Sequence, residues 1–270
     1  MKRVLAVILM LGMLLTGCGA SPARKVKKPS AKPGVYATAA GLDPAAGLLC
    51  VDGQKVTAGQ YLYWLADACG RIEKYYGGKA DWSSQRNGRT LSQCASDQAL
   101  SAVKFYAEVR IWAKRYGCKL TAADRTAAAE KAKRRGAALK LERSTAYQFC
   151  EDYCLYGKLY REFCTRDSRL YPPRAALDKF ASEKKLTAEN VWPAYFDALL
   201  ERAAGRASVQ KSAAYQKLNA EKFYKKLSAA RQKTARAASQ KKKKQHKKGN
   251  GGAHTVLGKM LNSVAVLIKN

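Results

Sequence analysis

The stretch VDGQKVTAGQYLYWL, residues 51–65, decides the fold expected for the first half of the chain. Asp52-Gly53 lies between two short β-prone runs, and this pattern predicts a β-hairpin with a type I′ turn. Thr57 and Gln60 follow in the spacing of a capping box, which satisfies the first backbone amides of a helix. The stretch therefore predicts a hairpin that runs directly into a helix. It contains no nucleophile, metal-ligand pair or phosphate loop.

The helix predicted after Thr57 has one apolar face and an excess of aromatic residues. The apolar face follows alternating spacings of three and four and consists of Leu62, Leu65, Cys69, Ile72 and Tyr76. Gly77-Gly78 is expected to end the helix. Tyr61, Tyr63 and Trp64 cannot all point the same way, so we expect some of them to line a surface that binds a partner. For each of the three taken singly, core packing is the favoured role, and only a contiguous exposed patch would indicate that they bind a partner.

The rest of the chain predicts a mainly helical protein. We expect long helices over about 90–116, 121–143 and 145–164, and shorter ones over about 175–185, 193–203 and 219–230. Residues 79–88 read as a polar loop. The helix over 145–164 has a predicted inner face that is nearly all aromatic: Phe149, Tyr153, Tyr156, Tyr160 and Phe163. Its three tyrosines, Tyr153, Tyr156 and Tyr160, are further candidates for contact with a partner.

The first residues predict export and attachment to a membrane. Lys2 and Arg3 precede the apolar run Val4–Leu15, which is typical of a signal peptide. The following Leu15-Thr16-Gly17-Cys18 resembles a bacterial lipobox, which implies cleavage before Cys18 and lipid attachment to its sulfur. A plain secretory signal with a chance cysteine is the alternative. We therefore expect a signal peptide over 1–17, a disordered tether over 18–46, and a protein anchored on the extracytoplasmic face of the cell membrane.

The charge balance predicts an anionic partner or surface. Lys and Arg number 51 against 20 Asp and Glu, a net charge of +31, which attracts anionic lipid, cell-wall polyanions or nucleic acid. Export disfavours nucleic acid. Residues 232–270 form a basic tail, and its candidates for contact with polyanions or a membrane are Lys241, Lys242, Lys243, Lys244, Lys247 and Lys248. The apolar helical pattern over 257–268 predicts either an interfacial helix or a solvated chain end.

The cysteines and histidines do not form a recognisable metal or catalytic pattern. Cys150 and Cys154 share a helical face, but the sequence has no Cys-x-x-Cys pair, and both histidines, His246 and His254, lie in the tail. A zinc site, a Ser-His or Cys-His hydrolase and an ATP-binding loop are all disfavoured, and no cofactor is expected. We interpret the cysteines as small apolar residues, and the pairing of any disulfides stays open among Cys50, Cys69, Cys94, Cys118, Cys150, Cys154 and Cys164.

Several stretches together resemble one protein family. After the hairpin stretch come AKRYGCKLTAADR (113–125), CEDYCLYGKLYREF (150–163) and PAYFDALLERAAGRASVQKSAAYQKLNAEKFYKKLSA (193–229). With the lipobox, they resemble the parvulin-type foldase lipoproteins, the PrsA/SurA-like secretion chaperones, over about residues 48–230. The resemblance implies a SurA/trigger-factor-like helical domain over 47–231, in which the C-terminal segment folds back on the N-terminal helices.

The chain departs from this family in the segment where a prolyl-isomerase domain is usually inserted. Only residues 174–190 separate Pro173 from the last matching stretch, far fewer than the roughly 50 residues of a small domain. That segment has neither His nor Cys, which the family's isomerase sites use. We therefore expect a tethered, non-enzymatic chaperone that binds unfolded exported polypeptides. The alternative is an envelope protein that binds polyanions, and whether two copies pair stays open.

Overall fold

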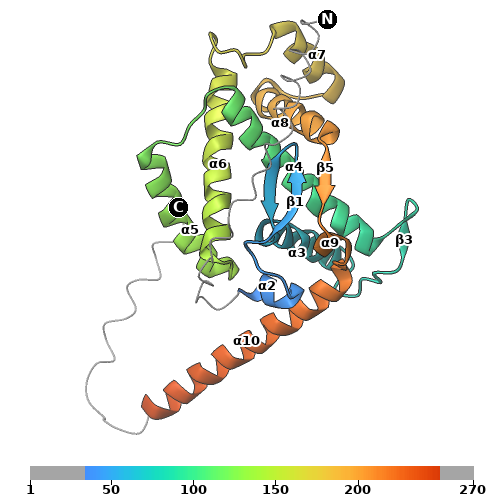
Figure 1. Cartoon of the computed structure of the whole chain (residues 1–270), viewed down its shortest axis with the longest axis vertical. Helices are drawn as coiled ribbons and strands as arrows, with labels where there is room; N and C mark the ends of the chain where they lie inside the picture. The colour runs from blue at the N-terminus through green and yellow to red at the C-terminus, as the bar shows by residue number, and fades with distance from the viewer. Residues whose placement is uncertain (1–33, 250–270) are drawn as a thin grey trace, which may run out of the picture. The chain divides into compact units, whose positions relative to one another are not determined.

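The computed structural model describes residues 34–249, with side chains described as far as Gln240 apart from Ala238. Within that range the chain is mainly helical, with nine helices and a small three-stranded antiparallel sheet (Figure 1). The predicted fold class is confirmed at this level. The signal peptide, Cys18 and the apolar pattern over 257–268 lie outside the described residues.

The segment just before the hairpin differs from the expected tether. Helix α2 (Val35–Ala40) packs against the core, and Tyr36 is buried within it. The Tyr36 hydroxyl donates to the Leu139 carbonyl at 3.1 Å and accepts a hydrogen bond from Arg231 Nη2 at 2.9 Å. The prediction of a disordered tether is therefore wrong for residues 34–46, because a buried aromatic ring with two distant partners holds this segment in place.

The predicted hairpin is confirmed, and a third strand extends it. Strands β1 (Gly47–Val51) and β2 (Gln54–Thr57) pair antiparallel around Asp52 and Gly53, whose φ angles of 43° and 80° fit a type I′ turn. Strand β5 (Val209–Lys211) pairs antiparallel with the other edge of β1, so the sheet order is β2-β1-β5. The sheet thus joins the beginning of the folded chain to a segment near its end.

Helices α3 (Ala58–Tyr75) and α4 (Leu91–Arg115) form the centre of the protein, and both begin at capping boxes. The Thr57 N–H donates to Gln60 Oε1 at 2.9 Å, and the Gln60 N–H donates to Thr57 Oγ1 at 3.4 Å. Thr90 and Gln93 repeat this arrangement at the start of α4. The expected polar loop between these helices contains a short hairpin, β3 (Gln85–Arg86) and β4 (Arg89–Thr90).

Two helical pairs follow. Helices α5 (Ala122–Leu139) and α6 (Arg143–Cys164) pack through small residues, and we call this pair the α5–α6 arm. Helices α7 (Arg174–Lys184) and α8 (Ala188–Arg206) come next, and α8 starts earlier than predicted, so that Pro193 lies inside it. Pro lacks an N–H, so the Glu189 carbonyl loses its usual partner within the helix.

The chain then returns to its N-terminal part through α9 (Ala213–Gln216) and α10 (Ala220–Gly249). Helix α10 packs against α2, α3 and α4, where Phe223 and Leu227 join the largest core cluster. It continues to Gly249 instead of ending near residue 230 as predicted. Its sequence beyond Arg231 is rich in Ala, Lys and Gln, which all favour helix.

Candidate functional site

Aromatic side chains from four helices form one connected series, which we call the aromatic seam. Trp64 of α3 stacks on Tyr106 of α4 with ring centroids 5.4 Å apart and an interplanar angle of 16°. Tyr106 also contacts Tyr153 of α6 at 5.7 Å. Adjacent contacts extend the series to α8, and its members are Tyr63, Trp64, Phe105, Tyr106, Phe149, Tyr153, Tyr156, Tyr160 and Phe196.

The seam contains five of the six aromatic residues that the sequence singles out. Tyr63, Trp64, Tyr156 and Tyr160 are half-buried in it, and Tyr153 is 48% exposed. The sixth, Tyr61, is only 1% exposed and donates its hydroxyl to the Ser96 carbonyl at 3.3 Å. Burial raises the pKa of Tyr61 well above its ordinary value. Tyr61 is therefore a core residue, and its assignment as a surface contact is wrong.

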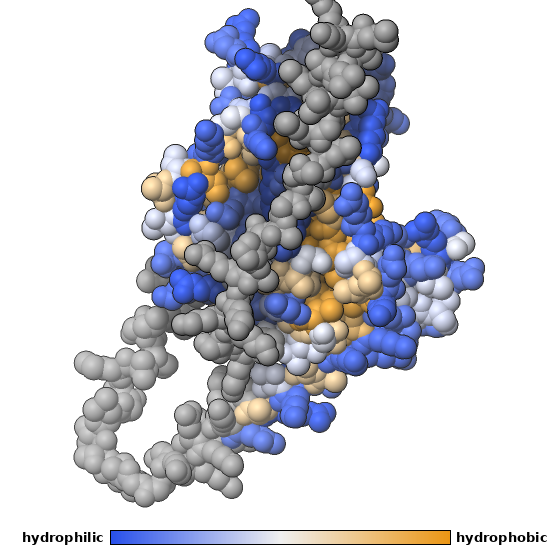
Figure 2. Space-filling model, in the orientation of Figure 1, coloured by the Kyte–Doolittle hydropathy of each residue, from blue (hydrophilic) through white to orange (hydrophobic). Residues whose placement is uncertain are grey.

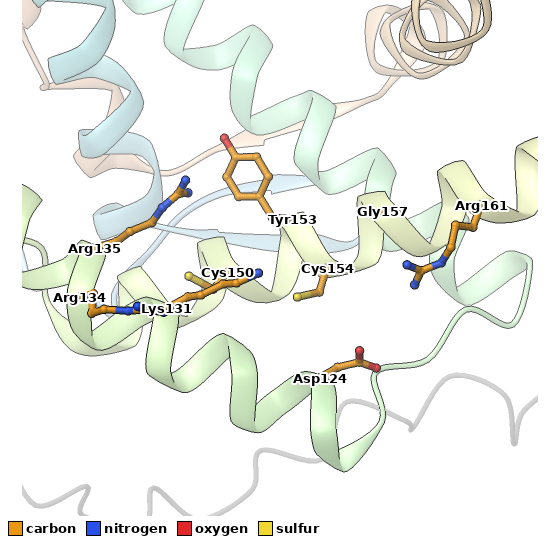
Figure 3. Close-up of a pocket in the computed structure, with 9 residues that line it drawn as sticks. All are labelled: Asp124, Lys131, Arg134, Arg135, Cys150, Tyr153, Cys154, Gly157 and Arg161. Carbon is orange, nitrogen blue, oxygen red and sulfur yellow. The ribbon is translucent and has the colours of Figure 1, made fainter. Parts of the chain in front are cut away.

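A groove lies against the seam between the two helices of the arm, and we call it the α5–α6 groove. Its volume is about 520 Å³. Figure 3 shows the residues that line it: Asp124, Lys131, Arg134, Arg135, Cys150, Tyr153, Cys154, Gly157 and Arg161. Tyr153 belongs both to this lining and to the seam, so the exposed end of the seam opens into the groove.

The electrostatics of the α5–α6 groove are cationic. Four of its lining residues are Lys or Arg, and one is an acid, Asp124. Asp124 accepts an ion-pair contact from Lys158 Nζ at 2.8 Å, and it also caps α5 through Thr121. These contacts, with Lys158 first, hold the pKa of Asp124 well below its usual range. The negative charge of Asp124 is thus balanced by Lys158, and the remaining cations give the groove a net positive charge.

A second hollow, between α4 and α8, has different chemistry. Its volume is also about 520 Å³, and its lining residues are Ser101, Ala102, Lys104, Phe105, Tyr106, Asp197, Glu201, Ala204 and Gly205. Asp197 accepts a hydrogen bond from the Tyr156 hydroxyl at 2.6 Å. Burial, and then this hydrogen bond, raise the pKa of Tyr156, so its hydroxyl stays protonated and remains the donor. This α4–α8 hollow has two acids and one lysine, so its charge is opposite to that of the α5–α6 groove.

The seam connects the two hollows. The Tyr106 ring lines the α4–α8 hollow and contacts Tyr153 of the α5–α6 groove. Beside it, the Trp64 Nε1 donor is buried without a hydrogen-bond partner, next to a small hollow that Tyr106 also lines. Arg110 and Asp152 complete the wall of that small hollow and form a paired contact at 2.6 and 2.7 Å. Burial raises the pKa of Asp152, and the Arg110 guanidinium opposes that shift.

Large apolar side chains are exposed at scattered positions among the described residues. The exposed large hydrophobic residues among those described are Tyr75, Leu139, Tyr153 and Tyr171. In Figure 2 hydrophilic residues dominate the visible face, with apolar areas over the sheet and its neighbouring helices and a smaller one over the arm.

The structure gives no cluster of metal ligands in the part of the chain that it describes. Among those residues no three His, Cys, Asp or Glu side chains gather in a way that could hold a metal ion. The seven cysteines in this range are free thiols. Cys69 is fully buried, and burial raises its pKa to about 12, which makes it a poor nucleophile.

The lysine run of the tail is only partly described. Lys241–Lys244, Lys247 and Lys248 belong to the helical backbone of α10, and their side chains lie outside the described residues. Within residues 34–249 no helix has the length and apolar character needed to cross a membrane. The role of these lysines at a membrane or polyanion therefore stays a prediction.

Sequence reasoning missed the α5–α6 groove. The signal was present, because Lys131, Arg134 and Arg135 recur at helical spacings of three and four on the Ala-rich segment before Leu139. Without knowing that α6 packs there, these residues look like an ordinary solvated helix face.

No known protein family, curated protein or solved structure matches this chain.

Proposed function

We propose that this protein is a non-enzymatic, chaperone-like protein that binds unfolded segments of exported polypeptides, tethered outside the membrane through Cys18. The observation that carries the proposal is the aromatic seam, which opens at Tyr153 into one groove and at Phe105 and Tyr106 into another. Tyr and Trp offer large amphipathic contact areas at low entropic cost. Such surfaces suit tolerant binding of many sequences.

The arrangement of the chain supports this proposal. In the foldase lipoproteins that the sequence resembles, the C-terminal segment folds back on the N-terminal helices. Here β5 pairs with β1, and α10 packs against α2 and α3. The segment 174–190 forms α7 and the start of α8, and no isomerase pocket is proposed there. Without an ATP-binding loop in the sequence, release of the bound chain would be passive.

The experiment that tests the proposal measures aggregation of a chemically unfolded test protein at low and at high salt. The added protein is a soluble form that lacks residues 1–18. We expect suppression of aggregation that survives high salt, because apolar contacts are not screened by ions. We expect Tyr153→Ser to weaken the suppression. Tyr75→Ser is the matched control, because Tyr75 is 70% exposed and lies outside the seam.

A second candidate function, polyanion binding, is favoured by the cationic α5–α6 groove and by the net charge of +31. Binding through about six phosphate contacts weakens roughly a thousandfold between low and moderate salt. Suppression of aggregation that vanishes with salt, together with tight binding to a polyanion at low salt, would support this second function and contradict the first.

A further inference from the structure

The cations of the α5–α6 groove come from both helices and surround one space. Lys131 reaches along the groove from α5 toward Cys154, and the Arg161 guanidinium points toward Cys154 from the other direction on α6 (Figure 3). Arg135 covers the other end, where its guanidinium carbon lies 5.5 Å from the centre of the Tyr153 ring. Of the ion pairs among the described residues, none involves Lys131, Arg135 or Arg161. These charges are therefore available to an incoming anion.

We infer that the α5–α6 groove binds acidic segments of unfolded polypeptides, an inference that rests on the proposed function and names the class of segment it selects. Arg pairs with carboxylates through two parallel hydrogen bonds, so a groove with Arg134, Arg135 and Arg161 fits Asp and Glu side chains. The half-exposed Tyr153 ring provides an apolar surface for a neighbouring side chain of the same segment. The groove volume lies in the range of small-ligand sites, which is enough for a short extended segment.

The charge of the chain itself argues that the occupant is another protein. No acidic residue follows Glu221, so the C-terminal tail has the same sign of charge as the groove. A second copy of this chain also has a net charge of +31 and would be repelled at long range. The only acid in the lining, Asp124, is engaged by Lys158 and does not compete for the arginines.

Gly157 makes the middle of the groove accessible. A Cβ atom added at Gly157 would meet no atom within 4 Å beyond its chain neighbours and the nearby backbone of its own helix, so the glycine leaves open space on α6 between Cys154 and Arg161. Gly inside a helix costs about 0.5–1 kcal/mol relative to Ala. A residue that weakens the helix and leaves a hollow is consistent with a place kept free for a ligand.

The first experiment measures binding of two fluorescent peptides to the soluble chain by anisotropy. One peptide contains Asp, Glu, Tyr and Leu, and the other replaces each acid by Asn or Gln. We expect Lys131→Ala with Arg161→Ala to weaken binding of the acidic peptide on the order of tenfold, because two partly exposed ion pairs are lost. The control, Lys133→Ala with Arg143→Ala, removes the same charge from exposed positions of α5 and α6 outside the groove and should change binding less than twofold.

A second variant tests the same site without changing its charge. Gly157→Leu should fill the open space and weaken binding of the acidic peptide, while circular dichroism shows unchanged helix and equal or higher thermal stability. Equal binding by Gly157→Leu and the parent protein would overturn the inference.

The outcomes separate this inference from the proposed function. If the neutral peptide binds as tightly as the acidic one and aggregation is still suppressed, the selectivity for acidic segments is wrong and the chaperone function stands. If neither peptide binds, aggregation is not suppressed and inorganic polyphosphate binds tightly, both proposals are wrong. Tighter binding of the acidic peptide, lost in the groove variants and kept in the control, is the expected result.

Discussion

The central core around α3 and the α5–α6 arm are built on different principles. The central core buries large side chains such as Leu62, Leu65 and Phe223 between helices and the sheet. The arm joins its two helices through Ala128, Ala132, Ala146 and Cys150, with Gly136 also buried in their contact. Small residues let the helices approach closely and provide little hydrophobic stabilisation. The arm can therefore present a groove and a row of cations, but its stability depends on a well-fitted, thin interface.

The largest expected difference between the two regions is in the core. Leu65 is fully buried, and Leu65→Ala should lower the free energy of unfolding of the whole chain by about 2–5 kcal/mol, through lost transfer energy and the cavity left behind. Urea denaturation followed by circular dichroism measures this loss. A loss below about 1 kcal/mol would mean that the core relaxes around the change and would contradict the contrast with the arm.

A smaller and more local loss is expected in the arm. Ala132 is 2% exposed where α5 meets α6, and Ala132→Leu should overpack the contact and cost about 1–3 kcal/mol. Hydrogen exchange followed by mass spectrometry should detect faster exchange in α5 and α6 and unchanged protection in α3. Uniformly faster exchange in all three helices would show that the arm and the core unfold as one unit.

The capping boxes allow a matched test in the two regions. Thr57→Ala and Thr121→Ala each remove the side chain that accepts the N–H of the third helical residue, and each should cost about 1 kcal/mol. Thr57→Ala is expected to lower the midpoint of global unfolding. Thr121→Ala should raise hydrogen exchange mainly in the first turns of α5, because Thr121 caps that end of the helix.

The smallest expected effect is a response of the arm to acid. Asp124 has a pKa below its usual range, so its ion pair with Lys158 stabilises the folded arm above the ordinary Asp pKa of about 3.9. That contribution is lost as the pH falls through the lower folded pKa. Pepsin cleavage near residues 119–142 should therefore rise between about pH 4 and pH 2, relative to cleavage in α3.

Asp124→Asn is the control for this titration. The amide keeps an oxygen for the Thr121 N–H but forms no ion pair with Lys158, so cleavage of the variant should already be raised at pH 4 and depend less on pH. An identical pH profile for the two proteins would exclude Asp124 as the group that responds.

Local signals explain which parts of the fold the sequence predicts. The turn at Asp52-Gly53 and the caps at Thr57 and Thr121 depend on neighbouring residues, and their positions agree with the structure. Tyr36 could not be placed, because its partner Arg231 lies 195 residues away. The sequence prediction ended α10 near residue 230. In the structure the helix continues to Gly249, because no glycine or proline interrupts its helix-forming residues between Ala230 and Gly249.

The candidate site was predicted only in part for a similar reason. Five of the six aromatic residues belong to the seam, because Tyr and Trp on neighbouring helical turns tend to meet across helices. The face on which Tyr61 lies depends on the distant Ser96 and Tyr215. The groove needs Lys131 and Arg161 to face each other from two helices, and this geometry exists only once the arm has folded.

The pairing of β1 with β5 has a consequence for the order in which the chain folds. The Ser208 N–H donates to Asp52 Oδ1 at 2.8 Å across a separation of 156 residues, and β5 then covers the free edge of β1. An uncovered strand edge is a template for pairing with other chains. During synthesis, which runs from the N-terminus, the first hairpin is therefore made long before the strand that completes its sheet. A chain synthesised only as far as α8 leaves this edge of β1 unpaired and open to other chains, and synthesis of the last quarter supplies the strand that covers it.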